Sequence, residues 1–133
     1  MLGAVIGESR GKRTGRRVLS VDGGVKIEVS FEDSGTLLGA AANTIGTYWS
    51  QVKQDGSLYG EGQGVVLTAN GDMATWKGQG TGKLLAGGAA CYRGALHYTT
   101  ASASLAGLNS IAAVFEFDVD TEGNTHAKSW EWK

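Results

Sequence analysis

Apolar and polar side chains alternate along most of the chain, and the alternating runs end at clusters of Gly, Asn and Asp. A period of two is the side-chain period of a β-strand, whereas a helix repeats its apolar residues every three or four positions. Only Ser102 to Asn109 has a helical pattern, with Leu105 and Leu108 on one face, and we expect it to cap one end of the fold. The expected strands span residues 4–18, 25–33, 36–53, 57–68, 73–84, 89–101, 111–120 and 124–132.

Glycine occupies every second position in two neighbouring runs, which places the glycines of each run on one face of a strand. Because glycine weakens a strand interior by about 0.5–1 kcal/mol, this pattern indicates a bend, a close backbone approach or a vacancy. The sequence therefore predicts an all-β fold: a single antiparallel up-and-down β-barrel of about eight strands with one short helical segment, formed by residues 1–133 as one domain. The glycines are Gly60, Gly62 and Gly64, then Gly78, Gly80 and Gly82.

Three of the turns have glycine as the third loop residue, which is typical of a type I turn closed by a left-handed glycine and a bulge. This turn type fixes the register of the flanking strands. In the last hairpin it pairs Asp118 with His126, so that opposite charges face each other. In the hairpin around Asn70 it pairs Gly62 with Gly78. The three loops are Gln54–Gly56, Ala69–Gly71 and Thr121–Gly123.

The direction in which each strand face points decides where a site can lie. One set of positions is small or apolar, and the opposite set is mostly charged or amide, so we expect the first set to line the interior. The inward set contains Tyr48, Ser50, Val52, Leu58, the six glycines, Val66, Ala74, Trp76, Tyr92, Leu96 and Tyr98.

Some large apolar residues must then lie on the outer surface. Three of them fall on the polar face of their strands. The last hairpin carries two aromatic pairs on opposite faces, so one of the two pairs must point outward. Because extensive exposed apolar patches usually mark contacts between molecules, we expect a homo-oligomer, a trimer or a dimer. The residues are Trp49, Val65 and Leu67, together with either Phe115 and Phe117 or Trp130 and Trp132.

Composition and charge narrow the function classes. The 41% hydrophobic content excludes a disordered chain. Five cations between Arg10 and Arg17 could form a patch for an anionic partner, but without interleaved aromatics we expect a solvated strand and no nucleic-acid binding.

No apolar run approaches the ~18 residues of a spanning helix, and the N-terminal apolar residues precede the charges, unlike a secretory signal. With Cys91 as the only cysteine, we expect a cytoplasmic protein without membrane contact.

No motif in the chain identifies a reaction, a metal or a cofactor. The glycine runs match neither a P-loop nor a dinucleotide fingerprint, and His97 and His126 lack metal-ligand spacing. Glu61, flanked by glycines, would have a raised pKa if it turned into a narrow barrel and could then act as a general base; otherwise it is an outward carboxylate facing solvent. Tyr48 is the second candidate catalytic residue, because its phenol could polarise a substrate.

A group of inward-facing residues could bind a ligand. Phenol hydroxyls beside an indole ring and an aliphatic side chain make an amphipathic wall, which suits either a small-molecule pocket or a packed core. The expected ligand-binding residues are Tyr48, Trp76, Tyr92, Leu96 and Tyr98.

Three blocks of the sequence resemble small, uncharacterised bacterial proteins of one domain, and their glycine-rich hairpins resemble the allene oxide cyclase-like and dirigent β-barrels. The resemblance implies an eight-stranded antiparallel barrel, commonly trimeric, that holds a hydrophobic small molecule. No functional residue of those barrels matches a position here. The blocks are GTYWSQVKQDGSLYGEGQGVV (residues 46–66), ATWKGQGTGK (74–83) and AAVFEFDVDTEGNTHAKSWEWK (112–133).

Three functions are compatible with such a barrel. The first is a cofactor-free cyclase or isomerase that acts on a small hydrophobic or oxygenated molecule. The second is a non-catalytic small-molecule carrier, and the third is a packed barrel that acts in assembly. A buried ionisable group in a cavity would favour the first function, an all-apolar cavity the second, and a filled interior the third.

Overall fold

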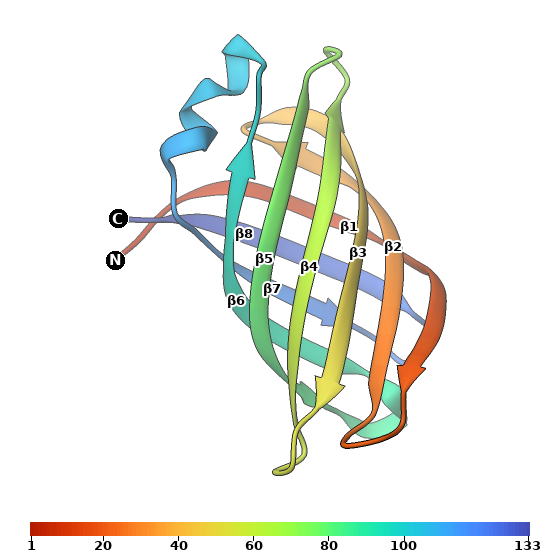
Figure 1. Ribbon diagram of the computed structural model, residues 1–133. Helices are drawn as coiled ribbons and strands as arrows, with labels where there is room; N and C mark the ends of the chain where they lie inside the picture. The colour runs from red at the N-terminus through yellow and green to blue at the C-terminus, as the bar shows by residue number, and fades with distance from the viewer.

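The computed structural model describes all 133 residues and forms a closed antiparallel barrel (Figure 1). Each strand pairs with the next one along the chain, and the last strand closes on the first. The predicted up-and-down barrel of eight strands is confirmed. The strands are β1 (Leu2–Ser20), β2 (Lys26–Leu37), β3 (Ala40–Val52), β4 (Ser57–Thr68), β5 (Met73–Leu84), β6 (Ala90–Thr99), β7 (Ala113–Val119) and β8 (Asn124–Trp132).

The three glycine-closed turns form as expected. Gly56, Gly71 and Gly123 all have φ near +85°, between 84° and 86°, in the left-handed region that favours glycine. The backbone N–H of Gly71 donates to the carbonyl of Thr68 at 3.0 Å, and the other two glycines make the equivalent bond. The registers that follow from these turns are confirmed, because Gly62 pairs with Gly78 and Asp118 pairs with His126.

The boundary between the second and third strands differs from the expectation. Ser34 and Gly35 suggest a turn, but both lie inside β2, which continues to Leu37. The chain reverses at Leu38 and Gly39, whose φ values of 49° and 82° give the two positive dihedrals of a type I′ hairpin. A leucine in this conformation is uncommon, so the sequence carries no obvious signal for the turn.

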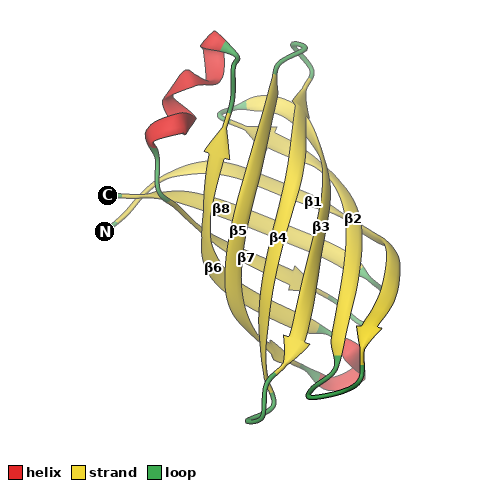
Figure 2. Ribbon diagram, viewed as in Figure 1, coloured by secondary structure: helices red, strands yellow, loops and turns green.

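The helical segment closes one end of the barrel, as predicted. Two short 3₁₀ helices occur, η1 (Ala86–Gly88) and η2 (Ala103–Ser110), and η2 covers the end near the β4–β5 hairpin (Figure 2). Leu108 is 0% exposed and packs with Leu105 in a core cluster that also contains Ile6, Leu37 and Leu96. Neither 3₁₀ helix has the length or the hydropathy of a membrane-spanning segment.

The inward-facing set points into the barrel as expected, and a second core cluster fills the end opposite η2. This cluster consists of Phe31, Leu58, Tyr92, Phe117 and Val119. In the last hairpin the phenylalanines therefore face the interior, which leaves the tryptophan pair on the outside.

The alternating glycines are explained by close approach of neighbouring strands. A Cβ atom on Gly78 would lie 2.8 Å from the carbonyl oxygen of Ala95 on β6, and one on Gly60 would lie 2.9 Å from that of Trp49 on β3. Cβ atoms do not normally approach main-chain oxygens so closely, so the sheet can coil this tightly only where side chains are absent.

We therefore expect Gly78→Ala to destabilise the barrel by about 1–3 kcal/mol, because the added methyl group collides with β6. Gly15→Ala is the matched control, since a Cβ there has no atom within 4 Å. Urea denaturation of both variants measures the difference. A Gly78→Ala protein as stable as the control would show that the glycine is not needed for strand approach.

Candidate functional site

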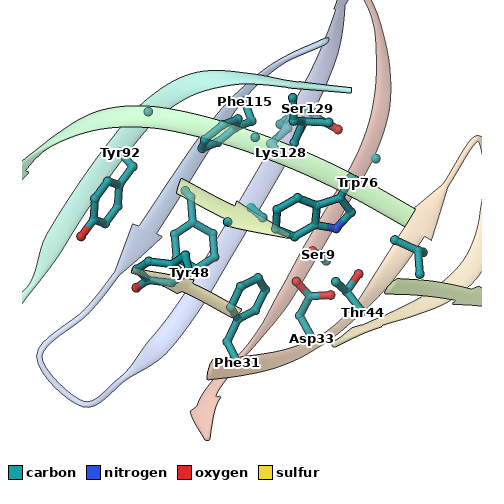
Figure 3. A pocket seen from close by; sticks show the side chains of 18 of the residues that line it. Ser9, Phe31, Asp33, Thr44, Tyr48, Trp76, Tyr92, Phe115, Lys128 and Ser129 are labelled. Carbon is teal, nitrogen blue, oxygen red and sulfur yellow. The ribbon is translucent and has the colours of Figure 1, made fainter. Parts of the chain in front are cut away.

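The barrel interior contains a cavity of about 130 Å³ between aromatic and aliphatic side chains (Figure 3). An apolar cavity of about 150 Å³ in another protein binds benzene, so this volume suits a molecule of about one ring. All five expected ligand-binding residues lie on its wall, and the cavity also touches both core clusters. The principal apolar lining residues are Phe31, Leu37, Tyr48, Val66, Trp76, Tyr92, Leu96, Tyr98, Phe115 and Phe117.

The aromatic rings of the wall hold one another in place. The ring centre of Phe31 lies 4.9 Å from that of Phe117 and 6.1 Å from that of Tyr48, within the range of favourable aromatic pairs. Tyr48 in turn makes an edge contact with Tyr92 at 5.7 Å. The Tyr92 hydroxyl is hydrogen-bonded to the Ser50 hydroxyl at 2.7 Å. These contacts connect the side chains of the cavity wall at the end away from η2.

Tyr48 faces this cavity, as the sequence predicts. Burial raises the pKa of its phenol well above the ordinary value of 10.0, with a smaller contribution from Tyr92. At neutral pH the phenol therefore keeps its proton. Tyr48 can donate a hydrogen bond to a bound molecule, but it cannot serve as a base there.

Glu61 borders the cavity along β4, but its side chain points away from it. Its side chain lies on the exposed outer face of β4, where its carboxylate accepts a hydrogen bond from the Tyr59 hydroxyl at 2.7 Å. The reason is strand alternation: Gly60 and Gly62 point inward, so the residue between them points outward. An open hollow of about 540 Å³ adjoins it on that face, also bordered by Trp49 and Gln79. Because its side chain does not turn into the barrel, Glu61 is not placed to act as a general base there.

The buried carboxyl of this cavity belongs to Asp33, which the sequence reading missed. Asp33 is only 7% exposed, and its Oδ1 atom has no hydrogen-bond partner in the protein. Burial raises the pKa of this carboxyl above its ordinary value of 3.8, and contacts with Ser9 and Thr44 oppose the shift only in part. Figure 3 shows Asp33 beside Ser9 and Thr44, close to the Trp76 indole.

A second polar contact extends this region of the wall. The hydroxyls of Tyr98 and Ser129 are 3.3 Å apart and buried. Burial raises the pKa of the Tyr98 phenol, and the hydrogen bond with Ser129 opposes this rise in part. The cavity thus combines an aromatic end with a polar cluster near η2, which we define as Ser9, Asp33, Thr44, Tyr98 and Ser129.

Alternation along β2 could have identified Asp33. Val29, Phe31 and Leu37 are buried and share one strand face, and Asp33 lies on that same face. A single carboxylate on an otherwise apolar, inward-facing stripe is a recognisable signal for a buried ionisable group. The signal was lost because the expected strand ended at residue 33, where a carboxylate at a turn needs no explanation.

These features define a class of protein: an eight-stranded barrel with a small interior cavity. No family model and no curated protein matches the chain. Solved structures share the fold over nearly the whole chain. A protein with unknown function from Clostridium acetobutylicum has a TM-score of 0.83 at 10% identity, covering 97% of both chains.

Two further bacterial structures agree with this match. A β-barrel-like protein from Acinetobacter baumannii gives a TM-score of 0.82 at 12% identity, covering 100% of this chain and 96% of the other. A conserved protein of unknown function from Rhodopseudomonas palustris gives 0.79 at 9% identity, covering 99% of both. The chain is therefore similar in fold to uncharacterised bacterial barrels, as its sequence blocks suggest, and identities this low establish the fold alone.

The raised pKa of Asp33 predicts a specific dependence of stability on pH. A group whose pKa is higher in the folded than in the unfolded protein contributes stability that is fully present below the unfolded pKa, near 3.8, and is lost as the pH rises through the folded pKa. Asp33→Asn removes this loss. Its free energy of unfolding should therefore increase relative to wild type above pH 3.8, by up to about 1.4 kcal/mol per pH unit.

Urea denaturation from pH 3.5 to 7 measures the effect, and Glu61→Gln corrects for the loss of one negative charge. Parallel stability curves for wild type and Asp33→Asn would contradict a raised pKa at this site.

Proposed function

We propose that this protein binds a small, largely apolar molecule inside the barrel. The observation that carries the proposal is the cavity of about 130 Å³, whose aromatic wall is held in place by its own ring contacts. Transfer of a ring-sized apolar molecule from water to such a wall is favourable, and a preformed site loses little free energy on ordering. The hydrophobic ligands implied by the resemblance to allene oxide cyclase-like and dirigent barrels fit the same description.

Catalysis without a cofactor, by a cyclase or isomerase, is the second candidate function. Asp33 favours it over a simple carrier, because a buried carboxyl in a cavity is a group that can transfer a proton, whereas an apolar carrier gains nothing from an unpaired polar atom. Tyr48 would supply a phenol donor from the opposite end of the cavity. A fully packed barrel that acts only in assembly fits the cavity least well.

Self-association is part of the proposal and rests on a patch of exposed apolar residues. Ile45 pairs with Val65 across β3 and β4, and Leu67 pairs with Met73 across β4 and β5, so the four residues form one outer patch. Burying such a patch against a second copy would contribute roughly 25 cal/mol for each Å² removed from water. Trp49 lies apart from this patch, covered by the Lys26 ammonium, which lies 4.1 Å from its ring centre.

Filling the cavity should abolish ligand binding. Ala127 lines the cavity from β8, and Ala127→Leu places three additional carbons in it. We expect toluene to raise the melting temperature of the wild type and to bind the variant at least about tenfold more weakly, because overpacked cavities exclude ligands.

Ala41→Leu is the matched control, since Ala41 is exposed on β3 and borders neither the cavity nor the outer hollow. Thermal shift and isothermal titration calorimetry provide the measurements. Equal affinity of the two variants for toluene would place the binding site outside the barrel.

Self-association is tested by light scattering. At micromolar concentration the wild type should have two or three times the monomer mass of 13.8 kDa, and Leu67→Glu should shift the measured mass towards 13.8 kDa. Leu84→Glu is the control, because Leu84 is also exposed, at 59%, but lies outside the patch. A wild-type particle of 13.8 kDa would contradict self-association.

A further inference from the structure

Asp33 is an unusual residue for the wall of an apolar cavity. It is 7% exposed, its Oδ1 atom has no hydrogen-bond partner although Ser9 and Thr44 lie nearby, and the rest of the cavity wall is mostly hydrocarbon. Buried polar atoms in folded proteins almost always have a hydrogen-bond partner, so an orphaned one needs an explanation. A bound molecule that supplies the missing partner is such an explanation, because Asp33 borders the cavity directly.

The surroundings of Asp33 are polar but carry no other charge. Thr44 lies directly opposite it on β3, and Ser9 reaches it from β1. Tyr98 from β6 and Ser129 from β8 complete the polar cluster. Among these neighbours only Tyr98 is titratable, and its phenol is neutral at ordinary pH.

The charged side chains of the adjoining strands are engaged elsewhere. Glu8 lies 2.7 Å from His126 and 3.8 Å from Lys128, in a pairing on the outer face. Arg13 on β1 acts on the interior at Tyr48, whose pKa it lowers slightly, but neither Arg13 nor Lys128 contributes to the pKa of Asp33, so no cation compensates an ionised Asp33. A buried carboxyl without a compensating cation favours its protonated form, which is a hydrogen-bond donor.

We propose that Asp33 is the polar contact of the ligand and that the cavity selects ring-sized molecules with one hydrogen-bond-accepting oxygen, such as a cyclic ketone, over hydrocarbons of the same shape. This inference rests on the proposed function and adds the chemical class of the ligand. The Asp33 hydroxyl donates to the ligand oxygen, and the aromatic rings of Phe31 and Trp76 contact its hydrocarbon part. A cationic amine should bind more weakly than the ketone, since only the ionised carboxylate would compensate its charge.

Two isosteric probes test the selectivity: cyclohexanone and methylenecyclohexane, which differ only in an oxygen replaced by a CH₂ group. Their affinities are measured by calorimetry for wild type and Asp33→Leu, and the ratio of the two affinities is compared between proteins. This comparison cancels the difference in hydration of the probes. We expect the preference for the ketone to fall by about tenfold in Asp33→Leu, the size of one hydrogen bond to a buried group.

Asp33→Asn is a second variant that keeps a hydrogen-bond donor. It should retain the ketone preference, and its affinity should not vary with pH, whereas the wild type should bind the ketone more weakly as Asp33 ionises. Cyclohexylammonium serves as the cationic probe and should bind wild type more weakly than the ketone.

The outcomes separate this inference from the proposed function. An equal ketone preference in wild type and Asp33→Leu, or tighter binding of cyclohexylammonium than of cyclohexanone, overturns the role of Asp33 while leaving the cavity as a binding site. Failure of both neutral probes to bind wild type overturns the proposed function, and the inference with it.

Discussion

The close approach of neighbouring strand backbones at the glycines determines the shape of this barrel. Gly80 pairs with Gly60 on one side and with Gly94 on the other, so three adjacent strands have no side chain at this level of the interior. A Cβ atom on Gly80 would lie 2.9 Å from the Arg93 carbonyl and 3.2 Å from the Phe115 ring. Aromatic rings from other strands occupy the space that the glycines leave. The cavity lies where these rings do not fill that space completely.

The position of Asp33 is costly for a protein that only needs to fold. Replacing a buried, unpaired polar group by an apolar one of similar shape is often neutral or stabilising, so stability alone gives no reason for a carboxyl at this point. The nearby hydroxyls of Ser9 and Thr44 reduce the cost without removing it. A polar atom left free at the wall of an otherwise apolar cavity is the arrangement expected of a binding site, where one precise hydrogen bond sets orientation and specificity.

Much of the fold could be predicted from the sequence, because local signals agree with one another. Glycine at the third loop position predicted the register of two hairpins, and alternation correctly placed Tyr48, Trp76 and Tyr98 inside the barrel. The β2–β3 turn could not be recognised, since Leu38 adopts a positive φ that leucine rarely takes, and the false break at Ser34 concealed Asp33.

The candidate site was harder to predict than the fold. Glu61 is surrounded by glycines that carry no side chain, so its direction could be judged only from more distant residues in the strand. The cavity itself depends on distances across the barrel, such as the 4.9 Å between the rings of Phe31 and Phe117, which no local pattern encodes. Sequence patterns could therefore predict which residues face inward but not whether they leave space between them.

The most direct test of this account is a crystal structure with 4-bromocyclohexanone, in which anomalous scattering from bromine locates the molecule and shows its orientation. The account predicts one bromine position inside the barrel, with the ketone oxygen about 2.5–3.0 Å from Oδ1 of Asp33. A bromine peak only in the outer hollow beside Glu61, or an interior filled by protein side chains, would contradict it.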